Sequence, residues 1–170
     1  MRSKAGVNYK SILAVFTPYP DFSLLTDFMF NPSRDEARLF FFDVWEKYKE
    51  DQPLTDLQKL ALEIIILHPE YHKILDERER FLERDYLPET GDVNPFLHMS
   101  MHLAIEEQLS IDQPRGIRAL YERILKKTGD KHEAYHAVME CLAEMIWQAQ
   151  WNNTALNERT YLECLEKHSG

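Results

Sequence analysis

Residues 94–116 read NPFLHMSMHLAIEEQLSIDQPRG, and this stretch decides the class of fold. Asn94 followed by Pro95 is a typical helix start, because asparagine caps helices and proline is tolerated in the first turn. After this start, apolar residues cover almost every direction around the predicted helix axis. A helix that is apolar on nearly all sides is buried. The stretch therefore predicts a buried helix over residues 94–109, in which Glu107 lies on an edge that faces water.

Similar start and stop signals recur outward from this stretch. Asn31-Pro32 repeats the helix start, and Gly129 is placed to end a helix, since glycine readily adopts the left-handed conformation that follows a last turn. Alternation of the kind that predicts strands is nearly absent. Further helices are expected over residues 32–49, 54–67, 70–84, 114–128, 131–150 and 158–167. We therefore expect an all-α, single-domain helical bundle of about six helices.

The first 28 residues differ in character from the rest. They contain two prolines and mixed aromatic residues without helical periodicity, and Met29 directly precedes the first strong helix start. We expect residues 1–28 to be an N-terminal extension, peripheral or poorly ordered, and residues 29–170 to form the helical bundle domain.

Composition limits the classes of partner. The net charge of −9 repels phosphate backbones and anionic membrane surfaces, so neither nucleic acid nor membrane is an expected partner. No apolar run approaches the roughly 20 residues that span a bilayer. The two cysteines, Cys141 and Cys164, are expected to be reduced in a cytoplasmic protein. A protein partner or homodimer and the identity of any small-molecule substrate are left open.

Histidine spacing is the most informative feature for function. Six of the seven histidines form three pairs spaced four residues apart. Random placement of seven histidines gives roughly 0.24 such pairs. The four-residue spacing puts two side chains one turn apart on the same face of a helix, where two imidazoles can chelate one ion. The pairs are His68 with His72, His98 with His102, and His132 with His136.

These pairs predict a transition-metal site. Glu106 extends the second pair by the same step on the buried helix, where an unpaired carboxylate would be costly. Mixed histidine and glutamate ligands suit zinc, iron or manganese, and a bound ion could activate a water. Whether the protein is an enzyme, and whether Glu140 or Cys141 joins the site, is left open. The predicted ligands are His98, His102, His132, His136, Glu106, His68 and His72.

Two other interpretations compete with a metal site. In the first, the histidines form a structural polar network and the protein is a non-catalytic interaction module that uses aromatic residues near Phe40. Burial of those aromatic residues in the core is the simpler expectation for them. In the second, clustered histidines gain charge together below about pH 6.5 and make the bundle respond to pH.

Several strings are distinctive enough to indicate a family. They lie in residues 29–34, 68–72, 94–116 and 139–150. On these strings the chain resembles, from Met29 to near its end, a family of small Gram-negative bacterial proteins catalogued only as a domain of unknown function. The resemblance implies no reaction. Histidine and glutamate pairs on helices are also similar to those of haemerythrin-type and other metal-binding four-helix proteins. The spacings do not reproduce the haemerythrin ligand order, so oxygen carriage is not implied.

Overall fold

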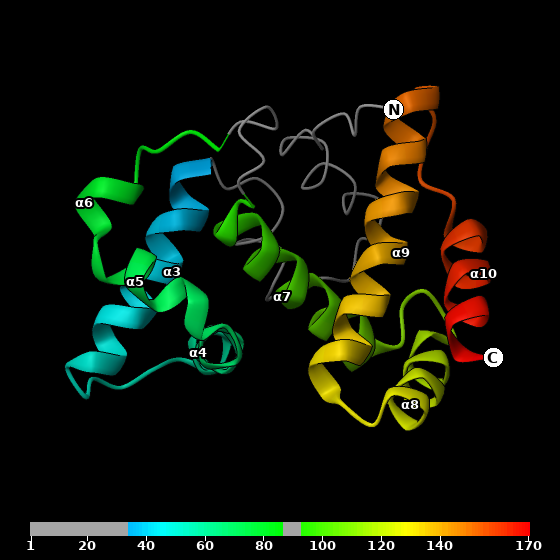
Figure 1. The fold of residues 1–170 in the computed structure, drawn as a ribbon, viewed down its shortest axis with the longest axis horizontal. Helices are drawn as coiled ribbons and strands as arrows, with labels where there is room; N and C mark the ends of the chain where they lie inside the picture. Colours follow the sequence, from blue (N-terminus) through cyan, green and yellow to red (C-terminus); the bar gives the residue numbers. More distant parts are fainter. Residues whose placement is uncertain (1–33, 87–92) are drawn as a thin grey trace. The chain divides into compact units, whose positions relative to one another are not determined.

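The computed structural model describes residues 34–86 and 93–170 (Figure 1). Eight α-helices and one 3₁₀ turn make up the regular structure of these residues, and no strand occurs among them. The all-α prediction is therefore confirmed. The expected extension over residues 1–28 and the helix start at Asn31-Pro32 lie outside the described residues. Within the described part, no helix is both long and apolar enough to cross a membrane.

The chain divides into two compact units, Met1–Leu103 and Ala104–Gly170. Helix α7 (Pro95–Ile111) contributes its beginning to the first unit and its remainder to the second. Each unit is described by itself.

The first unit places an aromatic and aliphatic core among short helices. Helix α3 (Arg34–Lys49) packs against α4 (Asp56–Leu67) and α5 (His72–Asp76). Phe41, Phe42 and Ile65 are fully buried there, so the aromatic run near Phe40 contributes mainly to the core. Thr55 caps α4: its hydroxyl accepts from the backbone N–H of Gln58, whose side chain accepts from the backbone N–H of Thr55 in return.

The single helix predicted over residues 70–84 is broken into three pieces. These are a 3₁₀ turn (Pro69–Tyr71), α5, and α6 (Arg78–Phe81), with a non-helical backbone at Glu77 between the last two. Leu75 and Phe81 are both buried. On a continuous helix these two side chains would point about 120° apart. The break at Glu77 allows both to enter the core, which explains why the helix count exceeds six.

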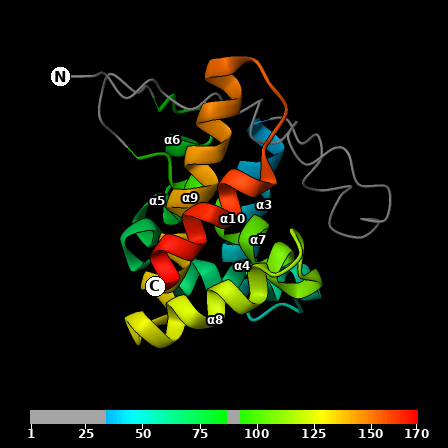
Figure 2. The ribbon, with the colours of Figure 1, turned by 90° about the vertical axis from the view of Figure 1, so that its right-hand side faces the viewer.

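Three helices of the second unit pack against one another. They are α8 (Ile117–Thr128), α9 (Lys131–Asn152) and α10 (Glu158–Ser169), and each contacts the other two. Figure 2 shows α10 lying across α9 with α8 beneath. Ile117, Leu120 and Ile124 form the buried stripe of α8. As predicted, α8 ends at Gly129, which has a φ of 72°.

Two sequence predictions fail in this unit. Cys141 and Cys164 are joined in a disulfide between α9 and α10, not reduced. Glu107 does not face water: only 8% of its surface is exposed, and burial raises the pKa of its carboxyl to about 7. The reason for the second error is that α7 is apolar on nearly all sides, so its sequence gives little information about which edge is exposed.

Candidate metal centre

Three histidines of the first unit gather their rings at one place. The Nε2 atom of His102 lies 2.9 Å from Nε2 of His68 and 3.2 Å from Nε2 of His98. The three ring centroids are 4.6–4.9 Å apart. Nε2 of His102 therefore lies close to the same nitrogen of both other rings. We call His68, His98 and His102 the histidine triad.

The nitrogen spacing of the triad resembles that of a coordinated ion. Zinc binds imidazole nitrogen at about 2.0–2.1 Å, so two nitrogens on a tetrahedral ion are about 3.3 Å apart. The two measured separations are 2.9 Å and 3.2 Å. A small outward movement of the rings would accommodate an ion at their meeting point.

Local helix structure explains how the triad forms. His98 and His102 stand one turn apart on α7. His68 follows the last residue of α4 and has non-helical backbone angles (φ −121°, ψ 66°), because Pro69 opens a 3₁₀ turn directly after it. His68 and His102 are each 1% exposed. Two buried imidazoles and a third that is half-buried thus meet at the end of α4.

Glu70 orients the most constrained member of the triad. Its Oε1 lies 2.9 Å from Nδ1 of His68. A carboxylate only accepts hydrogen bonds, so Nδ1 of His68 carries the proton and Nε2 has a lone pair directed toward His102. Carboxylates hold metal-binding histidines in this same way. Tyr71 stacks on His68 at 5.3 Å, and burial, followed by the charge of Glu70, raises the pKa of its hydroxyl to about 12.

His72, the sequence partner of His68, is directed elsewhere. Its Nε2 lies 2.9 Å from the carbonyl oxygen of Ile65 and therefore donates to it. Its ring packs against Trp45 at a centroid distance of 4.5 Å. The proline between the two histidines breaks the helical geometry on which the predicted pairing of His68 with His72 depended.

The second unit holds the third histidine pair. His132 and His136 lie one turn apart in the first half of α9, with ring centroids 4.1 Å apart. One ring nitrogen of each lies within 4.8 Å of the other. Both side chains are half-buried. The four-residue spacing thus places the two rings of this pair side by side, as the sequence predicts.

Glu106 is engaged with its own partners in the second unit. Its Oε1 accepts a short hydrogen bond from the hydroxyl of Tyr135 and lies 3.8 Å from Nζ of Lys131. Burial, followed by the hydrogen bond to Glu106, raises the pKa of Tyr135 well above its ordinary value. Glu140 is exposed on α9. The carboxylate predicted as a buried ligand is half-buried and is stabilised by a tyrosine and a lysine.

A family model described as a domain of unknown function, DUF1841, matches residues 33–167. The chain belongs to this family. No curated protein and no solved structure matches the chain. The resemblance predicted from Met29 onward is confirmed by the span of the match.

In this DUF1841 member, sequence reasoning missed one residue of the site. Glu70 was not singled out, although it stands two residues after His68. The short 3₁₀ turn between them carries the carboxylate back to the imidazole. Its signal in the sequence is the proline at position 69, because proline followed by an acidic residue favours a turn at that point.

Proposed function

We propose that the protein binds a transition-metal ion through Nε2 of His68, His98 and His102. The observation that carries this proposal is the position of Nε2 of His102, which lies 2.9 Å from Nε2 of His68 and 3.2 Å from Nε2 of His98. The carboxylate of Glu70 behind His68 supports it, because it fixes the tautomer that leaves Nε2 able to bind an ion.

The type of ligand limits which of zinc, iron and manganese is expected. Imidazole suits zinc and iron better than manganese, which prefers oxygen ligands. Three protein ligands on a tetrahedral ion leave one position for water or a substrate, as in catalytic zinc sites. An ion held by the triad would lower the pKa of a bound water and would polarise a carbonyl or phosphoryl oxygen. The reaction class that follows is metal-assisted hydrolysis or hydration.

The other predicted ligands are proposed with different degrees of support from their contacts. The rings of His132 and His136 lie next to each other, and we keep both as proposed ligands. Glu106 and His72 are weaker proposals, because each already makes a close hydrogen bond to another group.

Elemental analysis of protein purified without an affinity tag tests the metal proposal. We expect about one equivalent of zinc or iron for the triad, measured under oxidising conditions that keep both cysteines in the disulfide. His98→Gln combined with His102→Gln should remove it, since glutamine keeps the volume and polarity but binds such ions poorly. His72→Gln tests the weaker proposal for His72 separately, because a site made by the triad alone should retain the metal in this variant. Folding of each variant is checked by circular dichroism.

The same measurements can reject the proposal. Metal well below one equivalent that the double variant leaves unchanged, together with no uptake of added Zn²⁺ by chelator-treated protein, would reject a site at the triad. The same measurement on His132→Gln with His136→Gln tests the second pair separately.

The second candidate is a non-catalytic interaction module with a structural histidine network. The 2.9 Å contact between His68 and His102 favours it, since one ring nitrogen can donate to the other without any ion. It predicts that the His98→Gln and His102→Gln variant loses stability in metal-free protein. The metal proposal predicts instead that this variant loses the stabilisation that added metal gives to the wild type.

A cytoplasmic location in a bacterium is also a proposal, of which only the bacterial source rests on the family resemblance. Cell fractionation followed by immunodetection tests it. In such a compartment, cellular thiol systems would keep Cys141 and Cys164 reduced for part of the time.

A further inference from the structure

Two cysteines and a histidine of the second unit form a group separate from the histidine triad. Cys141 lies on α9, and Cys164 and His168 lie on α10. Both sulfur atoms and one ring nitrogen of His168 lie within 4.8 Å of one another. The cysteines are bonded to each other, with Cα atoms 5.7 Å apart.

The spacing of these residues is that of a chelate. Cys164 and His168 are four residues apart on α10, so their side chains share a face of that helix. Glu144 follows Cys141 by three residues on α9, and its Oε2 lies 3.9 Å from Sγ of Cys164. Its other carboxylate oxygen accepts from Nε2 of Gln148 at 3.0 Å. Two facing helices thus offer two sulfurs, one imidazole and one carboxylate.

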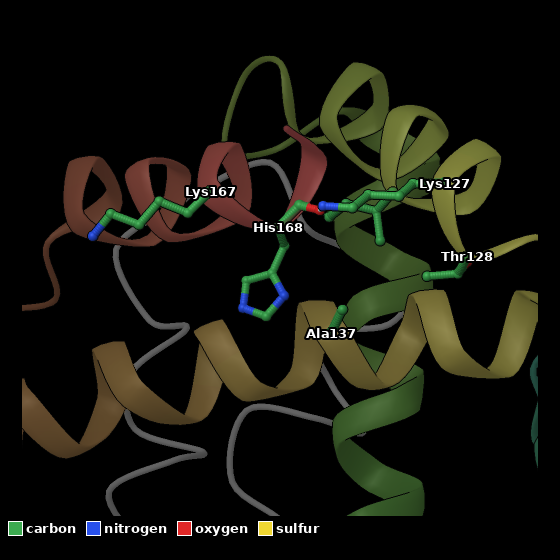
Figure 3. Close-up of a pocket in the computed structure, with 6 residues that line it drawn as sticks. Lys127, Thr128, Ala137, Lys167 and His168 are labelled. Atoms are coloured by element: carbon green, nitrogen blue, oxygen red, sulfur yellow. The ribbon is translucent and has the colours of Figure 1, made fainter.

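The fold holds His168 in place and leaves it accessible. Nζ of Lys127, on α8, donates to the carbonyl oxygen of His168 at 3.1 Å and ties the end of α10 to α8. In Figure 3 the imidazole of His168 points from α10 toward α9, whereas Lys167 extends along α10 away from it. His168 lines an open cavity of about 440 Å³. Ala137, which also lines this cavity, lies one turn before Cys141 on α9.

We propose that Cys141, Cys164 and His168 form a zinc site when the disulfide is reduced, with the nearby carboxylate of Glu144 or a water as the fourth ligand. A dithiol reductant donates two electrons and two protons to the S–S bond, giving two thiols, and is itself oxidised to a disulfide. Zn²⁺ then binds both sulfurs as thiolates and displaces their two protons. Oxidation by a peroxide or a disulfide re-forms the S–S bond and expels the ion.

Ligand chemistry selects zinc for this site. Two thiolates and one imidazole are three of the four ligands of a tetrahedral zinc ion, and the carboxylate of Glu144 or a water would supply the fourth. Thiolates also favour zinc over magnesium, calcium and manganese.

The two cysteines differ in exposure. Cys141 is 1% exposed and Cys164 is half-buried. An incoming thiolate therefore reaches the sulfur of Cys164 first, and Cys141 is the leaving group of the exchange.

Cobalt titration of the full chain tests the proposal, since Co²⁺ replaces zinc and gives a thiolate-to-cobalt charge-transfer absorption. We expect no such absorption in the oxidised protein. After reduction with a phosphine, the absorption should appear and should saturate at one equivalent of Co²⁺. The absorption should vanish in Cys164→Ser. His168→Gln should weaken Co²⁺ binding at least tenfold, and Lys167→Gln, the matched control on the same helix, should leave it unchanged.

A second measurement does not depend on variants that must fold. Reduced wild-type protein loaded with zinc should release one equivalent on treatment with hydrogen peroxide, as detected by a chromogenic chelator. Absence of the charge-transfer absorption in reduced protein would overturn the proposal, as would unchanged affinity in His168→Gln. The charge-transfer signal requires sulfur, so neither outcome bears on the histidine triad.

Discussion

At the scale of single residues, Glu107 makes stability depend on pH. Burial raises the pKa of its carboxyl from 4.5 to about 7 in the folded protein. The folded state therefore binds more protons than the unfolded state between these two values, and stability falls as the pH rises through this range. We expect the titration of Glu107 to lower the free energy of unfolding by about 3 kcal/mol between pH 4.5 and pH 8, relative to a residue that does not titrate.

Glu107→Gln isolates this effect, because it removes the charge and keeps the shape. The variant should be about 3 kcal/mol more stable than wild type at pH 8 and within about 0.5 kcal/mol of it at pH 4.5, as measured by urea denaturation. Glu122→Gln, an exposed substitution on α8, is the control and should change stability by less than about 0.5 kcal/mol. Equal stability of Glu107→Gln and wild type at pH 8 would contradict the expected effect.

Neighbouring residues of α7 show what sequence reasoning can and cannot establish. The spacing of His98 and His102 predicts that their rings share a face, and the structure brings them together. The environments of Glu106 and Glu107 could not be predicted in the same way, because they depend on side chains of other segments. Glu106 meets Tyr135 and Lys131, which are distant in sequence. Helical periodicity describes a single element, whereas hydrogen-bond partners depend on tertiary packing.

At the scale of elements, the cap of α4 controls how that helix begins. Thr55 and Gln58 exchange side-chain to backbone hydrogen bonds of 3.3 Å and 3.0 Å. The Gln58 amide also donates to Asp43 of α3 at 3.0 Å, which links the cap to the neighbouring helix. Thr55→Ala should lower the free energy of unfolding by about 1 kcal/mol.

Chemical denaturation of two variants checks the role of this cap. Thr55→Ser keeps the hydroxyl and should stay close to wild type, whereas Thr55→Ala should not. If both variants lose the same stability, the lost methyl group and not the capping hydroxyl is responsible.

Helix ends differ in how well the sequence predicts them. Asn94 and Gly129 mark ends correctly, because capping depends on the residue itself and its immediate neighbours. No glycine or proline lies next to Glu77, where the helix breaks. It arises because Leu75 and Phe81 both enter the core of the first unit, and a tertiary cause of this kind has no local signal.

At the scale of the whole molecule, a single covalent link adds to the stability given by packing. The disulfide closes a loop across a sequence separation of 23 residues between α9 and α10. Restricting the unfolded chain over such a loop stabilises the folded state by roughly 3 kcal/mol in the chain-entropy model. The expectation of reduced thiols came from compartment and composition. Neither property shows that Cys141 and Cys164 face each other on adjacent helices.

Reduction of this link should have a measurable effect that zinc partly reverses. A phosphine reductant should lower the free energy of unfolding by about 3 kcal/mol. Zn²⁺ added at 100 times its dissociation constant should then restore about 2.7 kcal/mol, since it binds the folded state preferentially. Combining Cys141→Ala with Cys164→Ala gives a variant whose denaturation curve should not respond to the reductant. If reduction leaves the wild-type curve unchanged, the link does not contribute to stability. If zinc leaves the reduced curve unchanged while the thiols are free, the two helices do not hold an ion at this place.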